Sequence, residues 1–270
     1  MPVDHYENFP VASWLLPRHL RSAVAAIYWF ARSADDIADE GELEPAERLR
    51  RLEAYRIELR QMAAGVASQD PIFIRLAAVI AEYQLPVELL DDLLDAFSQD
   101  VTQTRYADFA ELMAYCARSA NPVGRLLLRL YHAETPQNLA YSDKICSSLQ
   151  LINHWQDVGI DWRKGRLYLP QEDLLRFAVT EGQIAGATLD QNWRSLLQFQ
   201  VERARQLMLA GAPLGRLLPG RIGLEMRLII AGGLRILEKI EAAGYDVFRA
   251  RPSLTVFDWP RLLWRATTSL

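Results

Sequence analysis

The sequence predicts an all-α fold, and three observations support this prediction. Apolar residues recur at three- and four-residue spacing along almost the whole chain, and no stretch alternates as a half-buried strand would. Prolines and helix-capping residues stand where these apolar periods begin. No linker rich in Pro, Gly or Ser divides the chain, so we expect a single domain over residues 1–270 whose long helices surround a central cavity.

The first two predicted helices each open at a proline. Proline suits the first turn of a helix because an amide there would have no partner within the helix. Pro17 opens a long helix that runs to about Asp39, and Pro45 opens a second helix that ends near Gly65.

The later helices have similar punctuation. Asp108 and Glu111 form a capping box at the start of one helix, in which two side chains accept from free backbone amides. Asn121-Pro122 and Gly124 then predict a kink or a break. The remaining predicted helices begin at Pro71 and Pro86 or cover residues 137–161, 191–210, 222–243 and 262–266, with a loop over 165–170.

Two acidic patterns lie within these predicted helices. Asp35 and Asp39 are four residues apart, as are Asp157 and Asp161, so each pair lies on one helix face. Like charges at this spacing repel and cost an isolated helix about 0.2–0.5 kcal/mol. Hard cations such as Mg²⁺ bind carboxylate oxygens together with substrate phosphates. The two pairs therefore predict a Mg²⁺ site for a phosphate-bearing substrate.

Polar residues extend both acidic faces. Tyr28 and Arg32 precede the first pair at helical spacing, and Asn153 precedes the second. Lys164 and Arg166 follow the second pair in the predicted loop. If the two faces meet, four carboxylates share one space with cations at its rim, which suits a metal-bound diphosphate.

Acidic pairs at this spacing also occur without a metal. Exposed helices carry them freely, so either pair alone is compatible with a solvent-facing helix. Asp91, Asp92 and Asp95 repeat the first pattern, but no Tyr and Arg precede them on the same face. We expect this third cluster to be a solvated face. His154 points off the acidic face, and we expect it to pack in the core.

Composition restricts the partners and the location. A net charge of −4 argues against a general nucleic-acid binder. The N-terminal residues do not resemble a signal peptide and no 18-residue window is free of charge, so we expect a cytoplasmic chain without a transmembrane helix. An apolar C-terminal segment fits either a core helix or peripheral contact with the inner face of the membrane. It comprises Phe257, Trp259, Arg261, Leu262, Leu263, Trp264 and Arg265.

At these residues the chain resembles the squalene/phytoene synthase family of isoprenoid enzymes. The resemblance rests on residues 28–39, 115–124, 153–161 and 165–170, in this order and spacing. The family implies an all-α isoprenoid (terpenoid) synthase fold in which two Asp-rich motifs face each other and a Mg²⁺ cluster holds diphosphate.

The resemblance implies a role for each candidate residue. We expect the four motif aspartates to hold Mg²⁺, with Asp35 and Asp157 essential for catalysis. Tyr28 and Tyr115 would steady a carbocation through their rings or orient water. The residues expected to bind diphosphate are Arg32, Asn153, Lys164 and Arg166.

Three departures from the condensing members of the family indicate one branch. Residues 8–13 stand where condensing members carry a Ser-Arg-Ser-Phe-like stretch, and Gln156 stands where many carry Arg. Residues 119–122 read Ser-Ala-Asn-Pro where Val-Ala-Gly is usual. These changes remove groups that would serve a second prenyl diphosphate. They resemble the hydroxysqualene synthase branch of bacterial hopanoid biosynthesis.

That branch implies a Mg²⁺-dependent carbon–oxygen lyase. It would convert presqualene diphosphate and water to hydroxysqualene and diphosphate, alongside a separate presqualene diphosphate synthase and a hydroxysqualene reductase. Two alternatives stay open at this point. One is a condensing prenyltransferase that joins two prenyl diphosphates to squalene or phytoene. The other is a non-catalytic helical assembly factor, which the retention of all four motif aspartates disfavours.

Overall fold

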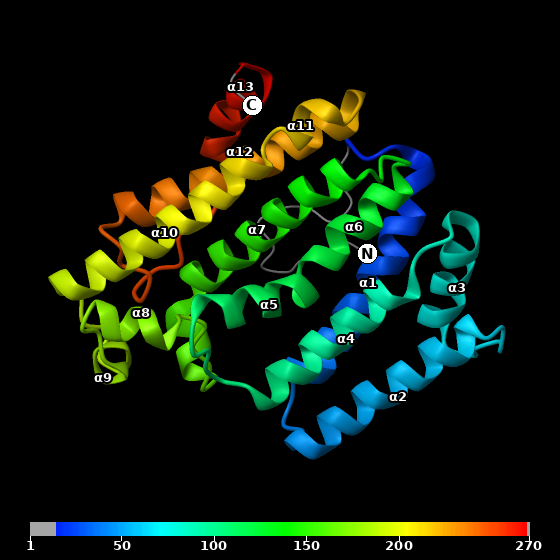
Figure 1. Cartoon of the computed structure of the whole chain (residues 1–270), viewed down its shortest axis with the longest axis horizontal. Helices are drawn as coiled ribbons and strands as arrows, with labels where there is room; N and C mark the ends of the chain where they lie inside the picture. The colour runs from blue at the N-terminus through cyan, green and yellow to red at the C-terminus, as the bar shows by residue number, and fades with distance from the viewer. Residues whose placement is uncertain (1–14, 269–270) are drawn as a thin grey trace.

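The computed structural model describes residues 15–268, and over that range its regular elements are all helices (Figure 1). The all-α prediction is therefore confirmed. The helices are η1 (Arg18–Leu20), α1 (Arg21–Asp39), α2 (Pro45–Ala63), α3 (Pro71–Tyr83), α4 (Val87–Thr102), α5 (Phe109–Ser119), α6 (Asn121–Leu130), α7 (Pro136–Arg163), α8 (Gln171–Arg176), α9 (Glu181–Ala185), α10 (Gln191–Gly211), α11 (Leu214–Leu217), α12 (Gly220–Ala242), η2 (Val256–Asp258) and α13 (Trp259–Thr268).

Most predicted helix starts are confirmed. α2 begins at Pro45 and α3 at Pro71, each with the proline in its first turn. The long N-terminal helix begins later than predicted, because residues 18–20 first form the short 3-10 turn η1. α7 extends two residues beyond the predicted end, to Arg163.

The start of α5 and the break after it follow the sequence signals closely. The Asp108 carboxylate accepts from the Glu111 amide at 2.8 Å, which confirms the N-cap. The reciprocal bond differs, because the Glu111 carboxylate accepts from the Ala107 amide at 2.6 Å. α5 ends at Ser119 and α6 begins at Asn121, so the predicted break is confirmed.

Two large apolar clusters hold the helices together. One includes Trp155 of α7, Trp193 of α10 and Ile236 of α12. The other includes Phe30 of α1 and Phe73 of α3. In Figure 1 the blue-to-teal helices α1–α4 lie on one side, the yellow and orange α10 and α12 lie on the other, and the green α5–α7 lie between them. The first Asp motif therefore lies on a helix of the outer group, α1, and the second on a helix of the middle group, α7.

The third acidic cluster is part of a helix–helix contact, which corrects the prediction of a solvated face. Arg56 of α2 binds Asp91 at 2.5 Å and Asp95 at 2.6 Å, both on α4. The guanidinium is largely buried while both carboxylates stay partly exposed. Asp91 and Asp95 therefore join α4 to α2.

The C-terminal segment is partly core and partly surface. Leu262 is buried in a small cluster with Leu228 and Ala231 of α12, as the core-helix alternative predicts for this residue. Phe257 and Trp264 are exposed. No helix within residues 15–268 is long and apolar enough to cross a bilayer. Residues 8–13, which the branch assignment used, lie outside the described residues.

Candidate active site

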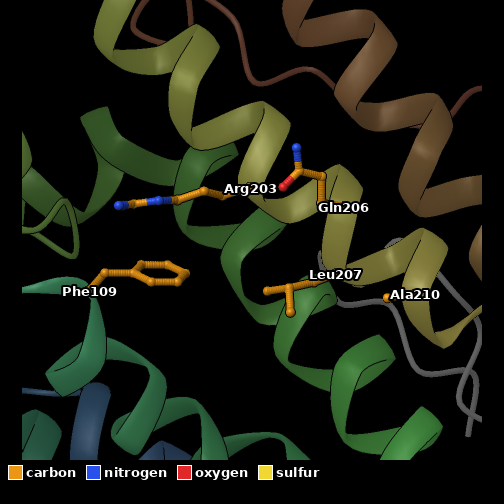
Figure 2. Close-up of a pocket in the computed structure, with 5 residues that line it drawn as sticks. All are labelled: Phe109, Arg203, Gln206, Leu207 and Ala210. Atoms are coloured by element: carbon orange, nitrogen blue, oxygen red, sulfur yellow. The ribbon is translucent and has the colours of Figure 1, made fainter.

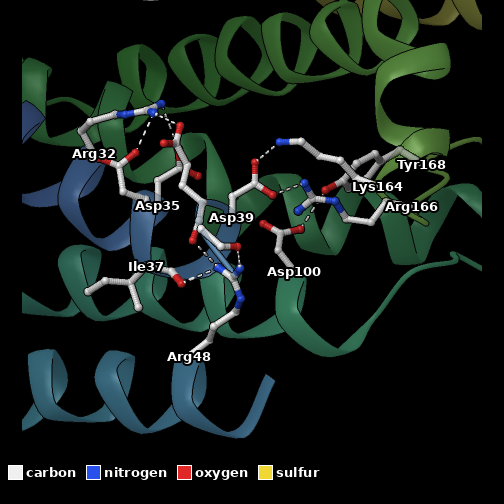
Figure 3. A network of polar contacts seen from close by, with 12 residues as sticks. Arg32, Asp35, Ile37, Asp39, Arg48, Asp100, Lys164, Arg166 and Tyr168 are labelled. Atoms are coloured by element: carbon white, nitrogen blue, oxygen red, sulfur yellow. Dashed lines mark hydrogen bonds and ion pairs between the residues drawn. The ribbon is translucent and has the colours of Figure 1, made fainter. Parts of the chain in front are cut away.

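The C-terminal end of the first Asp motif lies against the residues that follow the second motif (Figure 3). Asp39, the last residue of α1, forms ion pairs with both Lys164 and Arg166, which follow α7. These contacts bring the first motif against the end of the second. The structure thus places two of the expected diphosphate-binding cations on an expected metal ligand.

Arg32 pairs with two acids of its own helix, α1, and with Glu40, the residue that follows this helix. Its guanidinium lies 3.2 Å from Asp35, 2.6 Å from Asp36 and 2.9 Å from Glu40. Figure 3 shows this group beside Asp35, on the side away from Lys164. The charge of Arg32 is therefore compensated within the first motif.

Asp157 is paired with an arginine that sequence reasoning missed. Arg251, in the segment between α12 and η2, donates to both oxygens of Asp157 at 2.5 and 3.0 Å. The neighbouring residue Gln156 donates through Nε2 to the carbonyl of Pro252. No helical spacing links position 251 to the motif, and its one local signal is an Arg-rich, Pro-containing stretch after a helix.

Burial, with a smaller contribution from neighbouring acids, raises the pKa values of Asp35 and Asp161. Burial raises the pKa of Asp35 to about 6; Arg32 opposes this shift, and Asp39 and Asp100 add to it. Burial raises the pKa of Asp161 to about 7; Arg166 opposes this shift and Asp157 adds to it. Carboxyl groups with raised pKa values mark a site that an added cation would stabilise.

Asp39 differs from these two acids. Burial acts to raise its pKa, but Lys164 and Arg166 outweigh burial and hold the pKa below its ordinary value. Asp39 is therefore ionised at neutral pH, and its charge is met by two cations of the chain.

A further acid, Asp100 of α4, also lies at this site and was missed by sequence reasoning. The hydroxyl of Tyr115 donates to one of its oxygens at 2.8 Å, and that of Tyr168 donates to the other at 2.9 Å. Burial raises the pKa of Asp100 to about 6 despite these hydrogen bonds and the nearby Arg166. Nothing in the helical pattern of α4 distinguishes Asp100 from other acids, because its partners come from two distant stretches.

Tyr115 therefore has a defined contact, since its hydroxyl is directed to Asp100. The ring is buried among Tyr106, Tyr168 and His154. His154 stacks on Tyr168 with ring centroids 3.7 Å apart, and burial lowers the pKa of His154 to about 3. The prediction that His154 packs as a core residue is confirmed, and it is neutral.

The two remaining candidates lie on the motif helices. Tyr28 is half-buried on α1, one turn before Arg32, with its ring 5.5 Å from that of Trp29. Asn153 is exposed on α7, one turn before Asp157. Both positions agree with the helical spacing from which they were inferred.

The donor set fits a divalent cation, although the acids are not arranged as a ready metal-binding group. Within the described chain, no three Asp, Glu, His or Cys side chains are placed to hold a metal ion. Cations of the chain itself contact Asp35, Asp39 and Asp157 instead. A metal would replace those contacts, and its ligands would be hard carboxylate oxygens from both motifs.

A separate groove lies between α5 and α10 (Figure 2). Its volume is about 330 Å³, and it is lined by Phe109, Arg203, Gln206, Leu207 and Ala210. The Arg203 guanidinium lies 4.3 Å from the centroid of the Phe109 ring and also pairs with Asp173. The groove contains none of the candidate site residues.

Comparison with known proteins places the chain in a family. The family model of squalene/phytoene synthases matches residues 3–258. The chain belongs to the squalene/phytoene synthase family. Members of this family are enzymes that act on prenyl diphosphates.

Several squalene/phytoene synthase relatives are similar over most of the chain. A hydroxysqualene synthase of Rhodopseudomonas palustris is 39% identical over 241 residues, which cover 87% of this chain and 80% of the relative. A phytoene synthase of Arthrospira platensis is 30% identical over 266 residues, covering 92% and 84%. The crystal structure of squalene synthase HpnC from Alicyclobacillus acidocaldarius matches with a TM-score of 0.83 and 36% identity over 90% of each chain. The predicted isoprenoid synthase fold is thereby confirmed.

Proposed function

We propose that the protein is a hydroxysqualene synthase, which converts presqualene diphosphate and water to hydroxysqualene and diphosphate. The observation that carries this proposal is that residue 156 is a neutral, buried glutamine. The Gln156 side chain is buried and its amide is directed to the Pro252 carbonyl. It therefore offers no cation to a second diphosphate, whereas many condensing relatives have Arg here. The higher identity to a hydroxysqualene synthase than to a phytoene synthase supports the same assignment.

We propose Mg²⁺ as the cofactor, held by Asp35, Asp39, Asp157 and Asp161. When bound, the metal would supply Lewis-acid stabilisation of the leaving diphosphate. The supporting observations are the raised pKa values of Asp35 and Asp161 and the oxygen-only donor set.

The cations of the chain would bind the diphosphate oxygens. Lys164, Arg166 and Arg251 already lie against motif carboxylates, and Arg32 lies at the other end of the first motif. As the carbon–oxygen bond breaks, its electron pair leaves with the diphosphate, and fixed cations stabilise the charge that builds there.

The organic fragment becomes a carbocation, which rearranges by ring opening and is then captured by water. The added water then loses a proton to solvent, because the oxonium ion formed on capture is acidic and needs no strong base. The ring of Tyr28 would lie near this cation. The Tyr115 hydroxyl would orient Asp100, whose carboxylate lies near Arg166. We therefore propose that Tyr115 helps to fix the position of Arg166.

A direct assay tests the proposal against the condensing alternative. Purified protein with Mg²⁺ would be given either presqualene diphosphate or farnesyl diphosphate, and the products read by mass spectrometry. We expect hydroxysqualene from the first substrate and no coupled product from the second. Presqualene diphosphate, squalene or dehydrosqualene formed from farnesyl diphosphate alone would refute the assignment and make the chain a prenyltransferase. Failure to turn over either substrate, together with no Mg²⁺-dependent binding of diphosphate in calorimetry, would favour a non-catalytic assembly factor.

We further propose that the chain is a cytoplasmic protein that contacts the membrane peripherally through η2 and α13. Phe257 is 90% exposed, Val256 74% and Trp264 62%, which supports an apolar contact. Arg261 and Arg265 share the single carboxylate of Glu238, so positive charge remains beside this apolar contact, and anionic lipid would strengthen it. Wild-type protein should sediment with neutral phosphatidylcholine vesicles, and F257S/W264S should not. The substrate would come from a presqualene diphosphate synthase, and a reductase would consume the product.

A further inference from the structure

We infer that Gln156 is a positioning residue that holds Arg251 at the diphosphate site, an inference that rests on the proposed function of that site. Gln156 does so by anchoring the backbone next to Arg251 to helix α7. In this view position 156 acts on the substrate through a neighbouring arginine and not through its own charge.

The contacts that support this role lie on two adjacent pairs of residues. Gln156 and Asp157 are consecutive on α7, and Arg251 and Pro252 are consecutive in the segment between α12 and η2. The Gln156 amide donates to the Pro252 carbonyl, and Arg251 donates to both oxygens of Asp157. Gln156 and Asp157 thus each bind one of these two residues of the segment. The hydrogen bond to the Pro252 carbonyl and the ion pair of Arg251 therefore hold each other in position.

The segment that carries Arg251 is not helical, and its position depends on side chains. Asp246 accepts from the amides of Phe248 and Arg249 at 3.2 and 3.1 Å. Lys239 donates to the Ser253 carbonyl at 2.7 Å. Pro252 has no amide, so its carbonyl is the backbone group it can use for anchoring.

The segment also lies close against α7 near the second motif. A Cβ atom placed on Gly159 would stand 3.5 Å from the Phe248 Cα atom. Phe248 thus lies beside α7 at Gly159, and Gln156 binds the same segment four residues further on, at Pro252.

The chemistry of Gln156 fits an anchor. Its side chain is 1% exposed, and a buried polar group of this kind is stable only when it is hydrogen-bonded. A neutral amide can donate to a carbonyl in such a place without the cost of burying a charge. An arginine at position 156 is longer and charged, and it would have to displace Pro252. With Gln156 at this position, the segment keeps its place and Arg251 can reach the diphosphate site.

The test is a double-mutant cycle on ligand binding. Gln156→Met keeps the size of the side chain and removes the donor, and Arg251→Ala removes the cation that it is inferred to position. Binding of inorganic diphosphate in the presence of Mg²⁺ would be measured by calorimetry for wild type, both single variants and the double variant. We expect Gln156→Met to weaken binding about tenfold. We expect it to weaken binding no further in the Arg251→Ala background.

A matched control lies at the other end of the same helix. Asn138 of α7 is buried, and its amide donates to the Ala133 carbonyl at 2.8 Å. Asn138→Leu should lower stability as Gln156→Met does, but it should leave diphosphate affinity unchanged. If Gln156→Met does not fold, Gln156→Asn, which keeps the amide but is one carbon shorter, should weaken binding in the same direction.

Hydrogen exchange separates this inference from the proposed function. Gln156→Met should speed amide exchange across residues 248–253, and Asn138→Leu should not. If wild type does not bind Mg²⁺ and diphosphate, the proposed function fails, and exchange still decides whether Gln156 anchors the segment. Unchanged exchange in Gln156→Met would overturn the inference. An equal loss of affinity with and without Arg251 would overturn it too, because a general structural role would weaken both backgrounds alike.

Discussion

At the scale of single residues, Asp100 lies between two groups of the site that are far apart in sequence. It accepts from two buried tyrosine hydroxyls, and it lies close enough to Arg166 and Asp39 for their charges to affect its pKa. Two fixed donors allow little rotation of the carboxylate. Asp100 thereby presents a fixed negative charge near Arg166, which also pairs with Asp39.

Removing one of these donors should reduce activity while the fold is kept. We expect Tyr115→Phe to lower the turnover of presqualene diphosphate about tenfold, because one hydrogen bond to the buried carboxylate is lost. Steady-state kinetics with purified protein would measure this. Tyr83→Phe at the end of α3 is the control and should leave turnover unchanged; equal activity in both variants would contradict the role given to Asp100.

The motif aspartates lead to a stronger prediction. Asp35→Ala or Asp157→Ala should reduce turnover more than about a hundredfold, because each removes an expected metal ligand at the leaving group. The circular dichroism spectrum should stay that of the helical fold. Asp91→Ala, in the third acidic cluster, should lower the melting temperature by breaking the bond to Arg56 and should keep turnover. Full activity of either motif variant would disprove the metal-site assignment.

At this scale the sequence indicated the residues that follow a helical period and missed those that do not. Asp35, Asp39 and Asp157 were found because a spacing of four residues defines a helix face. Arg251 and Asp100 reach the site by tertiary contact with no periodic relation to either motif. Such contacts become visible only in the folded structure, where the helices are packed together.

At the scale of elements, the contact between α6 and α7 depends on a glycine. A Cβ atom on Gly124 would collide with the side chains of Ser142 and Cys146 on α7. α6 follows directly after the break at Ala120, so a shift of α6 would also be felt by α5, which carries Tyr115.

Gly124→Ala should therefore destabilise the protein by about 1–3 kcal/mol through overpacking. Thermal unfolding followed by circular dichroism would measure the loss. Gly182→Ala on the short helix α9, where a new Cβ would make only ordinary contacts, is the control and should change the melting temperature little. A destabilisation of the same size in both variants would show that close packing at α6 and α7 is not the cause.

Helices with strong local signals were predicted, and short ones were not. Pro45 and Pro71 marked their helices because proline and the apolar period agree at those residues. α8, α9 and α11 have four to six residues each, too few for a period to be visible in the sequence. Helices this short are stable only through the contacts that the rest of the fold provides.

At the scale of the whole molecule, the acids of the site make stability depend on pH. Asp161 has a pKa of about 7 in the folded protein and about 3.9 when unfolded. Between these values the folded state holds a proton that the unfolded state has lost. Its contribution is therefore full below about pH 4 and is lost as the pH rises through 7. Burial lowers the pKa of His154, which gives the opposite slope, chiefly below about pH 6.5. Asp35 and Asp100 have raised pKa values of about 6, so they too titrate mostly below about pH 6.5, and Asp161 makes the largest change between about pH 6.5 and 8.

The metal-free protein should thus lose a few degrees of melting temperature between pH 6.5 and 8. The side chain in Asp161→Asn cannot ionise, so the melting temperature of this variant should change less with pH over the same range. Calorimetric melting curves of both proteins would measure the slopes. A melting temperature that rises with pH, or equal slopes in the two proteins, would contradict the raised pKa of Asp161.

In the ligand-free site, acidic side chains pair with cationic side chains of the same chain. Mg²⁺ and diphosphate would replace both halves of these pairs. Arg251 on Asp157, and Lys164 with Arg166 on Asp39, occupy positions on the acids that a metal would take, while the acids occupy positions on the cations that a diphosphate would take. A metal alone would leave the released cations without partners, and a diphosphate alone would leave the acids without them. Each ligand should therefore raise the affinity for the other by the same factor, as thermodynamic linkage requires.

Calorimetry of Mg²⁺ binding with and without diphosphate, corrected for metal–diphosphate association in buffer, would measure that factor. We expect Mg²⁺ to bind at least about fivefold more tightly when diphosphate is present. Arg251→Ala should reduce the factor, because Asp157 is then open to metal from the start. Equal Mg²⁺ affinities in the two conditions would show that the resting pairs are not displaced by ligand. If the linkage holds, the departure of the product diphosphate would let the chain's own cations return to the acids and weaken the hold on the metal.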